Sequence, residues 1–514
     1  MESYRFDLVY TTDLHATMLA HDYGDGREEA KGLVRLASYL KTKTTPYLLL
    51  DNGDTIQGSP LMDCWLNGAM EEISPVALTM NQLGYDYVTL GNHDFNYGPD
   101  PLARYIMDLN APVLCANVVR PDGSLLFSPY AIHTLDNGIK IGIIGVVTQY
   151  IPHWEKPQNI SGFRFLDAYD TVIRYSQKLR DQVDALVVLY HGGLERDLET
   201  GTPQGRQTDE NEGYAIAQDA PLDVLFAGHQ HLRARGTIQG TLVMQTAAEG
   251  RDFGEVELRF ERESEDHPWR LVAKDGDIHA NDFPMDASIV SLLEPYESAT
   301  QAWLDEPLGT LAEGDMLLRD PFLARLNQHP LFDLVNALQL KASGADVSST
   351  SFANVARGFE KNITMRDLVA TFLYPNTLFV IEITGADLKE AMERSASYFR
   401  LVDGHVDVSP SFVNPKAEHY NYDVFGGVEY TMDLTRPTGQ RITALTRQGV
   451  PVSLDDTLRL VTSNYRAIGG GDYTMFYKAP ILQELPIGPL DLLRDYCQAK
   501  KMITPPKATY RIVR

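Results

Sequence analysis

The sequence predicts an α/β fold of layered sheets and helices, and two features of its first half carry this prediction. Up to about residue 260, short apolar runs typical of buried strands alternate with stretches of helical period. Such alternation is typical of domains in which helices cover the faces of a sheet. Five of the apolar runs also lead into a short polar cluster, as expected where buried strands end at one shared edge and their loops carry the chemistry.

The elements of this first region follow in a regular order. Apolar runs predict strands at residues 8–10, 47–50, 87–90, 185–190 and 224–227. Helical spacing predicts helices at residues 32–41, 73–84, 101–109 and 167–181. Val256, Leu258 and Phe260 alternate with charged neighbours, so we expect a half-exposed strand there, paired with residues 270–273. The polar stretch 275–282 then predicts a domain boundary.

A connecting helix and a second domain are expected beyond this boundary. Residues 284–305 have the spacing of a helix, which Pro295 should kink or split. After about residue 307 the pattern restarts, and helices are expected at 330–343 and 385–399 and a strand at 376–384. The second half carries few metal-type clusters, so we expect a smaller α/β domain that binds the substrate. The predicted boundaries are residues 1–284 for the first domain, 285–306 for the connecting helix and 307–514 for the second domain.

Composition restricts the partners and the compartment. A chain of 514 residues that is 44% hydrophobic can bury a large core in two or more domains. Its net charge of −25 argues against a polynucleotide partner, because phosphate backbones are held by basic patches, but it allows a small anionic substrate. The three cysteines are too widely spaced to predict a disulfide framework or a zinc site. Without a signal peptide or an apolar stretch of about 18 residues, we expect no membrane partner and a cytoplasmic protein, or a secreted or wall-attached one if a leader was trimmed.

Candidate metal ligands occur in five short signatures, each directly after an expected strand. They are Asp13-Leu14-His15, Asp51-Asn52-Gly53-Asp54, Gly91-Asn92-His93-Asp94, His191-Gly192-Gly193 and Gly228-His229-Gln230-His231. Each alone has an ordinary explanation, such as a turn beside a surface histidine or a solvated loop. Their recurrence in one order behind five strands argues against chance. Two cations about 3.5–4 Å apart can share a carboxylate, activate a water and clamp an in-line displacement at phosphorus. The sequence therefore predicts a two-metal phosphoesterase.

Longer strings around these signatures resemble the calcineurin-like metallophosphoesterases, and within them the two-domain 5′-nucleotidase and 2′,3′-cyclic-nucleotide phosphodiesterase family. The resemblance is carried by DNGDTIQGSP at 51–60, GNHDFNYG at 91–98, LYPNT at 373–377 and NYRAIGGG at 464–471. It therefore covers nearly the whole chain. For the first domain it implies a calcineurin-like β-sandwich flanked by helices, and for the whole chain it implies a nucleotide substrate.

The resemblance also implies a ligand set for each cation. One cation would be held by Asp13, His15, Asp54 and His231. The other would be held by Asp54, Asn92, His191 and His229, so that Asp54 bridges the pair. Carboxylate, amide and imidazole ligands suit manganese or zinc.

His93 is the residue expected to act beyond the metals. Beside a ligand, its imidazole can stabilise charge on the phosphoryl group or protonate the leaving oxygen, or it can merely orient a ligand. In the 5′-nucleotidase branch an aspartate three positions later supports this histidine, whereas here the position is Asn96. An amide orients the ring without adding negative charge. Asn96, within FNYG at 95–98, and the LYPNT string favour the cyclic-nucleotide branch.

Candidate substrate contacts lie in the second domain. The family grips a base between two aromatic rings, which implies Tyr420, with Tyr422 as its rival, and Tyr465. Each tyrosine could instead pack under its own loop. Arg357 and Arg466 are candidate contacts for phosphate or sugar.

Three functions stay open on the sequence. The first is opening of 2′,3′-cyclic nucleotides with removal of the resulting 3′-phosphate. The second is 5′-nucleotidase activity on the same fold, and the third is a non-catalytic nucleotide-binding or adhesion module. The full ligand set argues against the third function, and Asn96 argues against the second. Base preference, the physiological metal and the oligomeric state are not determined by the sequence.

Overall fold

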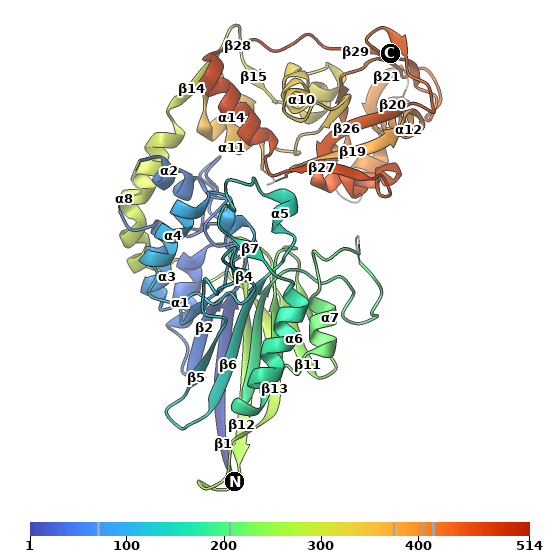
Figure 1. Cartoon of the computed structure of the whole chain (residues 1–514). Helices are drawn as coiled ribbons and strands as arrows, with labels where there is room; N and C mark the ends of the chain where they lie inside the picture. The colour runs from blue at the N-terminus through green and yellow to red at the C-terminus, as the bar shows by residue number, and fades with distance from the viewer. Residues whose placement is uncertain (69–71, 205–206, 374–375, 403, 414–416) are drawn as a thin grey trace. The chain divides into compact units, whose positions relative to one another are not determined.

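A computed structural model describes residues 1–514 apart from 69–71, 205–206, 374–375, 403 and 414–416. Tyr374 and Pro375 of the LYPNT string therefore lie outside the described residues. The chain divides into two compact units (Figure 1). Unit 1 comprises Met1–Asp22 and Arg27–Gln301, and unit 2 comprises Tyr23–Gly26 and Ala302–Arg514. The division falls inside helix α8 (Ala287–Leu304), within the stretch expected to connect two domains.

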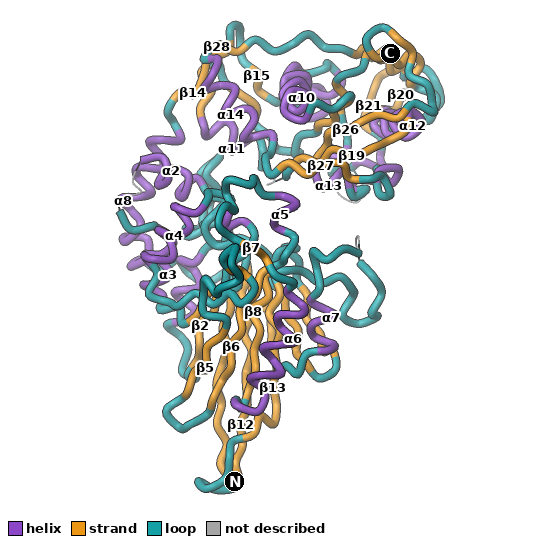
Figure 2. The backbone as a smooth tube through the Cα atoms, viewed as in Figure 1, coloured by secondary structure: helices purple, strands orange, loops and turns teal. Residues whose placement is uncertain are grey.

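Two β-sheets form the centre of unit 1 (Figure 2). The first has the order β13-β12-β1-β2-β3, with β1 Glu2–Thr11, β2 Tyr47–Asp51, β3 Tyr87–Val88, β12 Asp252–Arg262 and β13 Arg270–Ala280. The second has the order β10-β11-β9-β8-β6-β5, with β5 Tyr130–Thr134, β6 Lys140–Val147, β8 Ala185–His191, β9 Val224–Ala227, β10 Ala234–Ile238 and β11 Thr241–Gln245. Strands β1, β2 and β3 are parallel to one another, as are β6, β8, β9 and β11. Parallel strands bring their carboxyl ends to one edge of each sheet.

The two sheets pack face to face through a shared apolar core. Tyr10 of β1 stacks on Phe226 of β9 with ring centroids 4.0 Å apart, and both side chains are fully buried. Leu8 and Leu258 of the first sheet belong to the same cluster as Val187 of the second. Fully burying one such side chain contributes about 1.5–3 kcal/mol, so this core fixes the strand ends relative to each other.

Helices flank this sandwich, and the predicted layered α/β fold is confirmed. They are α1 Leu33–Leu40, α2 Pro60–Gly68, α3 Pro75–Leu83, α4 Pro99–Asp108, α5 Ile151–Trp154, α6 Ala168–Leu179 and α7 Gly213–Asp219. Helices α6 and α7 cover the outer face of the six-stranded sheet (Figure 1), where Val172 and Ile216 pack in one cluster with Val188. Helix α6 begins where the Asp167 side chain accepts a hydrogen bond from the Asp170 amide, as an N-cap should.

One local expectation is wrong, and another is narrowed. The polar stretch 275–282 is not a domain boundary. Its residues up to Ala280 form the second half of β13, and they pair with β12 up to the last pair, Ala280 with Asp252. As an edge strand, β13 exposes many side chains to water, so its composition imitates that of a loop. Helix α8 continues through Pro295, so of the two expected effects the split does not occur and the kink stays a prediction; Ile289 and Leu293 on the same helix are buried.

Unit 2 is a mixed α/β structure around a five-stranded sheet of order β22-β16-β26-β19-β27. These strands are β16 Val347–Thr350, β19 Leu378–Thr384, β22 Val424–Gly426, β26 Thr457–Ser463 and β27 Ile481–Leu485. Its longer helices are α10 Pro330–Ser343, α12 Gly385–Ala396 and α14 Pro489–Lys500, and shorter ones are α9 Pro321–Leu326, α11 Met365–Thr371 and α13 Asn464–Ala467. Helix α10 coincides with the predicted helix 330–343, and α12 ends three residues before the predicted residue 399.

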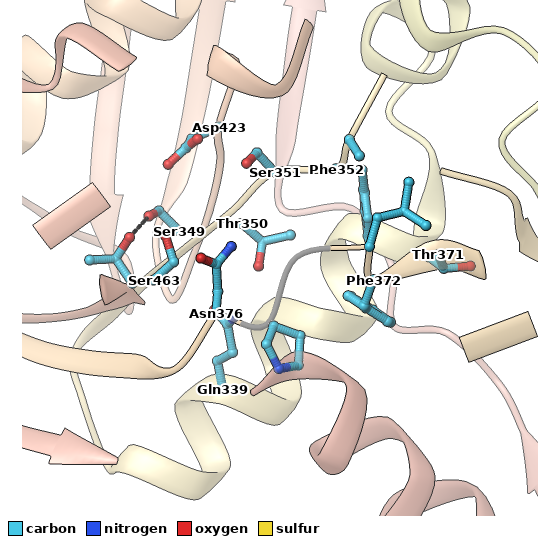
Figure 3. Close-up of a pocket in the computed structure, with 14 residues that line it drawn as sticks. Gln339, Ser349, Thr350, Ser351, Phe352, Thr371, Phe372, Asn376, Asp423 and Ser463 are labelled. Atoms are coloured by element: carbon cyan, nitrogen blue, oxygen red, sulfur yellow. Dashed lines mark hydrogen bonds between the residues drawn. The ribbon is translucent and has the colours of Figure 1, made fainter. Parts of the chain in front are cut away.

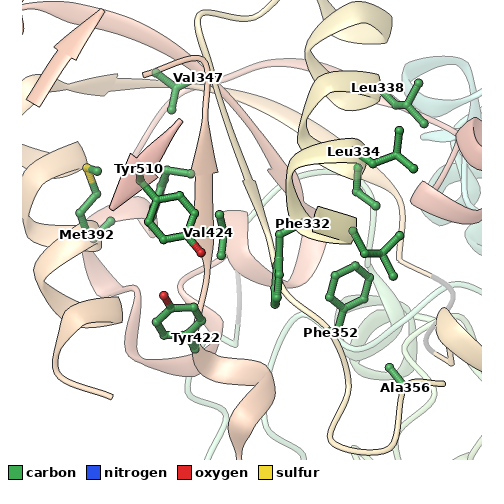
Figure 4. Close-up of a cluster of buried hydrophobic side chains, with 14 of the residues drawn as sticks. Phe332, Leu334, Leu338, Val347, Phe352, Ala356, Met392, Tyr422, Val424 and Tyr510 are labelled. Carbon is green, nitrogen blue, oxygen red and sulfur yellow. The ribbon is translucent and has the colours of Figure 1, made fainter. Parts of the chain in front are cut away.

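A large aromatic core stabilises unit 2 (Figure 4). Phe332 of α10 lies against Phe352 with ring centroids 4.8 Å apart, and Tyr422 and Val424 belong to the same buried cluster. The segment that carries the candidate residues Tyr420 and Tyr422 is thus anchored in this core by Tyr422 and Val424. None of the helices in the described part of the chain combines the length and the apolar content that crossing a bilayer requires.

Candidate metal centre

The candidate ligands of unit 1 lie at or just after the carboxyl ends of parallel strands. Asp13 follows β1, Asp54 follows β2, Asn92 follows β3 by four residues, His191 ends β8, and His229 follows β9. Strand order and sheet packing therefore bring together side chains that are far apart in the sequence. This placement agrees with the strand-and-loop pattern on which the prediction was based.

One group of ligand atoms comes from Asp13, His15 and His231, which lie within 4.8 Å of one another. His15 Nε2 and His231 Nε2 are 3.0 Å apart, and His231 Nε2 is 3.3 Å from Asp13 Oδ1. His15 Nδ1 lies 2.9 Å from the carbonyl oxygen of Gln57, which can only accept, so the ring carries its proton there. Its Nε2 then presents a lone pair to the group, as a metal ligand does.

A second group comes from Asp54, His191 and His229. His191 Nδ1 donates to the Asn52 carbonyl oxygen at 2.7 Å, which leaves Nε2 facing Asp54 Oδ2 at 3.1 Å. His229 Nδ1 is 2.8 Å from Asn92 Oδ1, so the asparagine joins this group. His191 Nε2 also lies 3.9 Å from Asp13 Oδ1, which links the second group to the first.

Buried polar atoms in the second group lack hydrogen-bond partners. Among the described residues, neither Asp54 Oδ2 nor His191 Nε2 makes a hydrogen bond, although they face each other. Leaving a buried polar group unsatisfied costs about 1–3 kcal/mol. A divalent cation between such atoms would satisfy both, so the donor set fits the metals that the sequence predicts.

The backbone of the ligands is itself unusual. Five of the seven candidate ligands adopt positive φ angles, namely Asp13 at 53°, His15 at 49°, Asp54 at 55°, His229 at 73° and His231 at 55°. Residues other than glycine rarely adopt positive φ angles, because each such residue costs about 1–3 kcal/mol. The loops also approach closely, since a Cβ added to Gly91 would lie 2.1 Å from Asp54 Oδ1. Strain concentrated on these residues is typical of a functional site.

Neighbouring charges and burial shift the pKa values of several residues in the cluster. Burial alone would raise the pKa of Asp13, but the positive charges of His191 and His231 lower it to about 2. Burial would lower the pKa of His191, yet the carboxylates of Asp54 and Asp13 raise it to about 10. The pKa of His15 falls to about 4 because of burial and the nearby charge of His231. Without a cation, Asp13 is therefore ionised and His15 neutral near pH 7, the forms that bind metals, whereas His191 carries a proton that a bound cation would have to displace.

His93 lies beside both groups, on the short helix η1 (His93–Phe95). Its amide donates to Asp54 Oδ1 at 2.7 Å, and its ring centroid is 5.5 Å from that of His15. Its Nδ1 is 2.7 Å from Asn96 Oδ1, as the sequence argument expected of Asn96. His93 is thus placed to act next to the ligands.

Two carboxylates of the site were missed by sequence reasoning. Glu210 Oε1 contacts His229 Nε2 at 2.9 Å and so can orient that ring. No signature precedes Glu210, which lies in the loop between β8 and α7. Asp94 accepts hydrogen bonds from the amides of Asp54, Thr55 and Gly91. It stood in the GNHD signature, but only the structure shows that it braces the Asp54 loop.

The candidate aromatic rings of unit 2 differ in exposure. Tyr465 is 42% exposed and Tyr420, on η4 (His419–Asn421), is half-buried. Tyr422 is fully buried, with its ring centroid 5.2 Å from that of Tyr398 and 5.4 Å from that of Phe399. Tyr422 therefore belongs to the core, and Tyr420 is left as the candidate ring of that segment.

The two candidate arginines have different surroundings. Arg466 is only 2% exposed and donates to Asp423 Oδ1 at 2.7 Å, to the Tyr420 carbonyl at 2.9 Å and to the Gly470 carbonyl at 2.7 Å. These bonds hold its own loops, and a phosphate or sugar contact from Arg466 stays a prediction. Arg357 is exposed on one side and forms ion pairs with Glu360 at 3.0 Å and Asp367 at 3.7 Å.

A polar pocket adjoins both tyrosine segments of unit 2 (Figure 3). Asp423 on its wall follows the Tyr420 segment, and Ser463 caps helix α13, which carries Tyr465. Ser349 and Thr462, also on the wall, share a hydrogen bond of 2.7 Å. Sequence reasoning missed this pocket because hydroxyl side chains carry no distinctive chemical signature.

Comparisons with known proteins match both halves of the chain. Residues 6–233 match the family described as calcineurin-like phosphoesterase, and residues 308–478 match the 5′-nucleotidase C-terminal domain. The chain is 29% identical to a 2′,3′-cyclic-nucleotide 2′-phosphodiesterase/3′-nucleotidase of Salmonella typhimurium, over 92% of this chain and 83% of that protein. It is also 27% identical to the trifunctional nucleotide phosphoesterase protein YfkN of Bacillus subtilis. That match covers 97% of this chain but only 38% of the length of YfkN.

A solved structure is similar along the whole chain. It is that of a Staphylococcus aureus protein provisionally described as a 5′-nucleotidase, in complex with alpha-ketoglutarate. The two chains are 33% identical, with a TM-score of 0.71 and coverage of 99% of this chain and 100% of the other. The similarity thus extends through both units.

Proposed function

The chain belongs to the calcineurin-like phosphoesterases that carry a 5′-nucleotidase C-terminal domain, a family of hydrolytic enzymes, and on that premise we propose that it hydrolyses nucleotide phosphoesters. Its preferred substrates are 2′,3′-cyclic nucleotides and the 3′-nucleotides that form when these are opened. The observation that carries the proposal is the pair of ligand groups with unsatisfied buried atoms at Asp54 and His191. Asn96 and the name of the Salmonella relative support the cyclic substrate.

Each ligand residue has a proposed role. Asp13, His15 and His231 would hold one divalent cation, and Asp54, His191 and His229, with Asn92 beside them, would hold the other. The family resemblance implies that Asp54 would also contact the first cation. Bound at these groups, two cations would polarise the phosphoryl oxygens and lower the pKa of an attacking water. Manganese and zinc both suit this donor set.

Residues outside the ligand groups bind and orient the nucleotide. With its Nδ1 proton held by Asn96 Oδ1, His93 turns Nε2 outward to protonate the leaving oxygen or to stabilise charge on the phosphoryl group. Tyr465 and Tyr420 stack on the base, which tolerates any base because every base has a π face. Arg357 is a candidate contact for phosphate or sugar. The substrate is a small nucleotide, since a net charge of −25 disfavours a polynucleotide.

A substrate panel tests the proposal directly. The protein is stripped with a chelator, reloaded with Mn²⁺ or Zn²⁺, and assayed on 2′,3′-cyclic AMP, 3′-AMP, 5′-AMP and bis(4-nitrophenyl) phosphate. We expect activity only after reloading, with higher kcat/KM for the cyclic and 3′ substrates than for 5′-AMP. A preference for 5′-AMP would favour the second candidate, a 5′-nucleotidase, which the description of the Staphylococcus aureus relative supports. A metal-loaded protein that cleaves none of the four would refute the enzymatic proposal.

A further inference from the structure

Asn96 has a second partner on its far side, a carboxylate from a distant loop. The Asn96 side-chain amide faces His93 Nδ1 with its Oδ1 at 2.7 Å and donates from Nδ2 to Glu155 Oε2. Glu155 follows α5, where its own amide caps the helix by donating to the Ile151 carbonyl at 2.9 Å. Two segments far apart in the sequence thus form one chain of side-chain hydrogen bonds that ends on His93.

Glu155 is held firmly in this position. Its Oε1 accepts from the Lys156 amide at 2.7 Å and from Asn159 Nδ2 at 2.8 Å. Asn159 Nδ2 also lies 2.7 Å from the Asn96 carbonyl oxygen, so it ties the two loops together. Glu155 is 7% exposed, and its carboxylate accepts these hydrogen bonds with no ion pair to a Lys, Arg or His among the described residues.

The carboxylate determines which way the amide of Asn96 points. An ionised carboxylate can only accept hydrogen bonds, so Asn96 must turn its NH₂ group to Glu155. Its Oδ1 is then fixed toward His93, whose Nδ1 must carry a proton to complete the bond. With the opposite amide orientation, two acceptors would face each other at Glu155. A proton on Nδ1 leaves Nε2 as the position at which His93 gives up or takes a proton.

We propose that Glu155 is a positioning residue for His93, acting through the amide of Asn96. The proposal rests on the phosphoesterase function above, in which His93 donates a proton from Nε2 to the leaving oxygen as the phosphorus–oxygen bond breaks. The ring then becomes neutral with its proton on Nδ1, the form that Asn96 Oδ1 accepts. The chain thereby supplies through Glu155 the negative charge that its sequence lacks at position 96.

Leaving-group dependence tests this role. Glu155→Gln allows the Asn96 amide to turn, so kcat on 2′,3′-cyclic AMP should fall by about 10–100-fold, the usual effect of removing a partner that orients a catalytic or ligating group. KM and metal content should change little. The rate on bis(4-nitrophenyl) phosphate should fall much less, because 4-nitrophenolate leaves without being protonated. Glu255→Gln is the matched control, since Glu255 is a half-buried carboxylate of β12 that pairs with Lys43.

An exchange of the two side chains sharpens the test. Asn96→Asp alone places a carboxylate against Glu155 and should also slow the cyclic substrate. Asn96→Asp combined with Glu155→Gln puts the carboxylate directly on His93 Nδ1 and lets the amide at 155 donate to it, so activity should exceed that of either single variant. Such non-additivity is expected only of residues in one network. Equal losses on both substrates, or a double variant slower than both singles, would overturn the proposal.

The tautomer of His93 gives a readout that needs no substrate. Ring ¹⁵N spectra, assigned by difference against His93→Gln, should show His93 protonated on Nδ1 in the unaltered protein. Glu155→Gln should remove this preference. A proton on Nε2 alone in the unaltered protein would refute the positioning role even if nucleotide hydrolysis were fully established. Failure of every phosphoester substrate with the expected tautomer present would instead refute the proposed function.

Discussion

The metal centre of unit 1 and the Arg466 cluster of unit 2 both bury charged side chains, but their hydrogen bonding is opposite. Arg466 donates to Asp423 and to the carbonyls of Tyr420 and Gly470, so the cluster is satisfied by the chain itself. In unit 1, Asp54 Oδ2 and His191 Nε2 face each other, and neither has a hydrogen-bond partner in the described part of the chain. A buried charge whose bonds are complete holds loops in place, whereas buried atoms left unsatisfied indicate a site built for a ligand.

The largest effect should come from the carboxylate proposed to contact both cations. Asp54→Asn removes a negative charge from the group with His191 and His229 and from the contact proposed for the other cation, so turnover should fall below detection and metal content should drop. Elemental analysis and activity after metal reloading measure this. Asp51→Asn is the control, because Asp51 is equally buried but bonds to the hydroxyls of Thr11 and Thr55. If Asp54→Asn kept full activity and two bound metals, Asp54 would not be needed for metal binding, and the contrast between this site and the Arg466 cluster would be refuted.

His93 separates catalysis from metal binding within the same region. His93→Ala should lower kcat on 2′,3′-cyclic AMP by about 10²–10⁴-fold, the range for general acid–base groups. The metal content should stay as in the unaltered protein, because the ring bonds to Asn96 and its contact with Asp54 comes from the backbone amide. Loss of metals together with activity would make His93 a ligand or a structural support.

Arg466 tests the other side of the comparison. Arg466→Met leaves the Asp423 carboxylate buried without its ion pair, which should destabilise unit 2 by about 3–5 kcal/mol. Hydrogen exchange of residues 420–423 and 464–471 should speed up, while the metal content of unit 1 stays constant. The double variant Arg466→Met with Asp423→Leu should recover part of the stability, because no unpaired charge is then buried. Unchanged exchange in the single variant would show that the buried pair does not hold these loops.

Local strings made the grouping of the candidate metal ligands predictable. Asp13 and Asp54 stand just after an apolar strand and His191 ends one, so their residue types and their place in the fold could be inferred together. Glu210 and Glu155 could not be found in this way. Each lies in a loop without a signature, and its contact with His229 or with Asn96 depends on how distant segments pack.

Burial was the other missing information. Arg466 and Tyr422 were themselves candidate contacts, and arginine is usually exposed, yet the structure buries both in unit 2. The edge strand β13 shows the reverse case, in which exposed polar residues were interpreted as a boundary although they pair along β12. Hydrophobic period locates elements well, but it does not show which polar residues the fold encloses.

The smallest effect concerns the exposed ring of unit 2. Tyr465→Ala should weaken binding of 2′,3′-cyclic AMP by about 1–3 kcal/mol, the usual contribution of one stacked base. Hydrolysis of bis(4-nitrophenyl) phosphate should barely change, because that compound has no base. Tyr477→Ala is a matched control, since Tyr477 is 44% exposed against 42% for Tyr465. Equal losses on both substrates would show that Tyr465 supports the fold, as Arg466 beside it does, and the stacking role would be refuted.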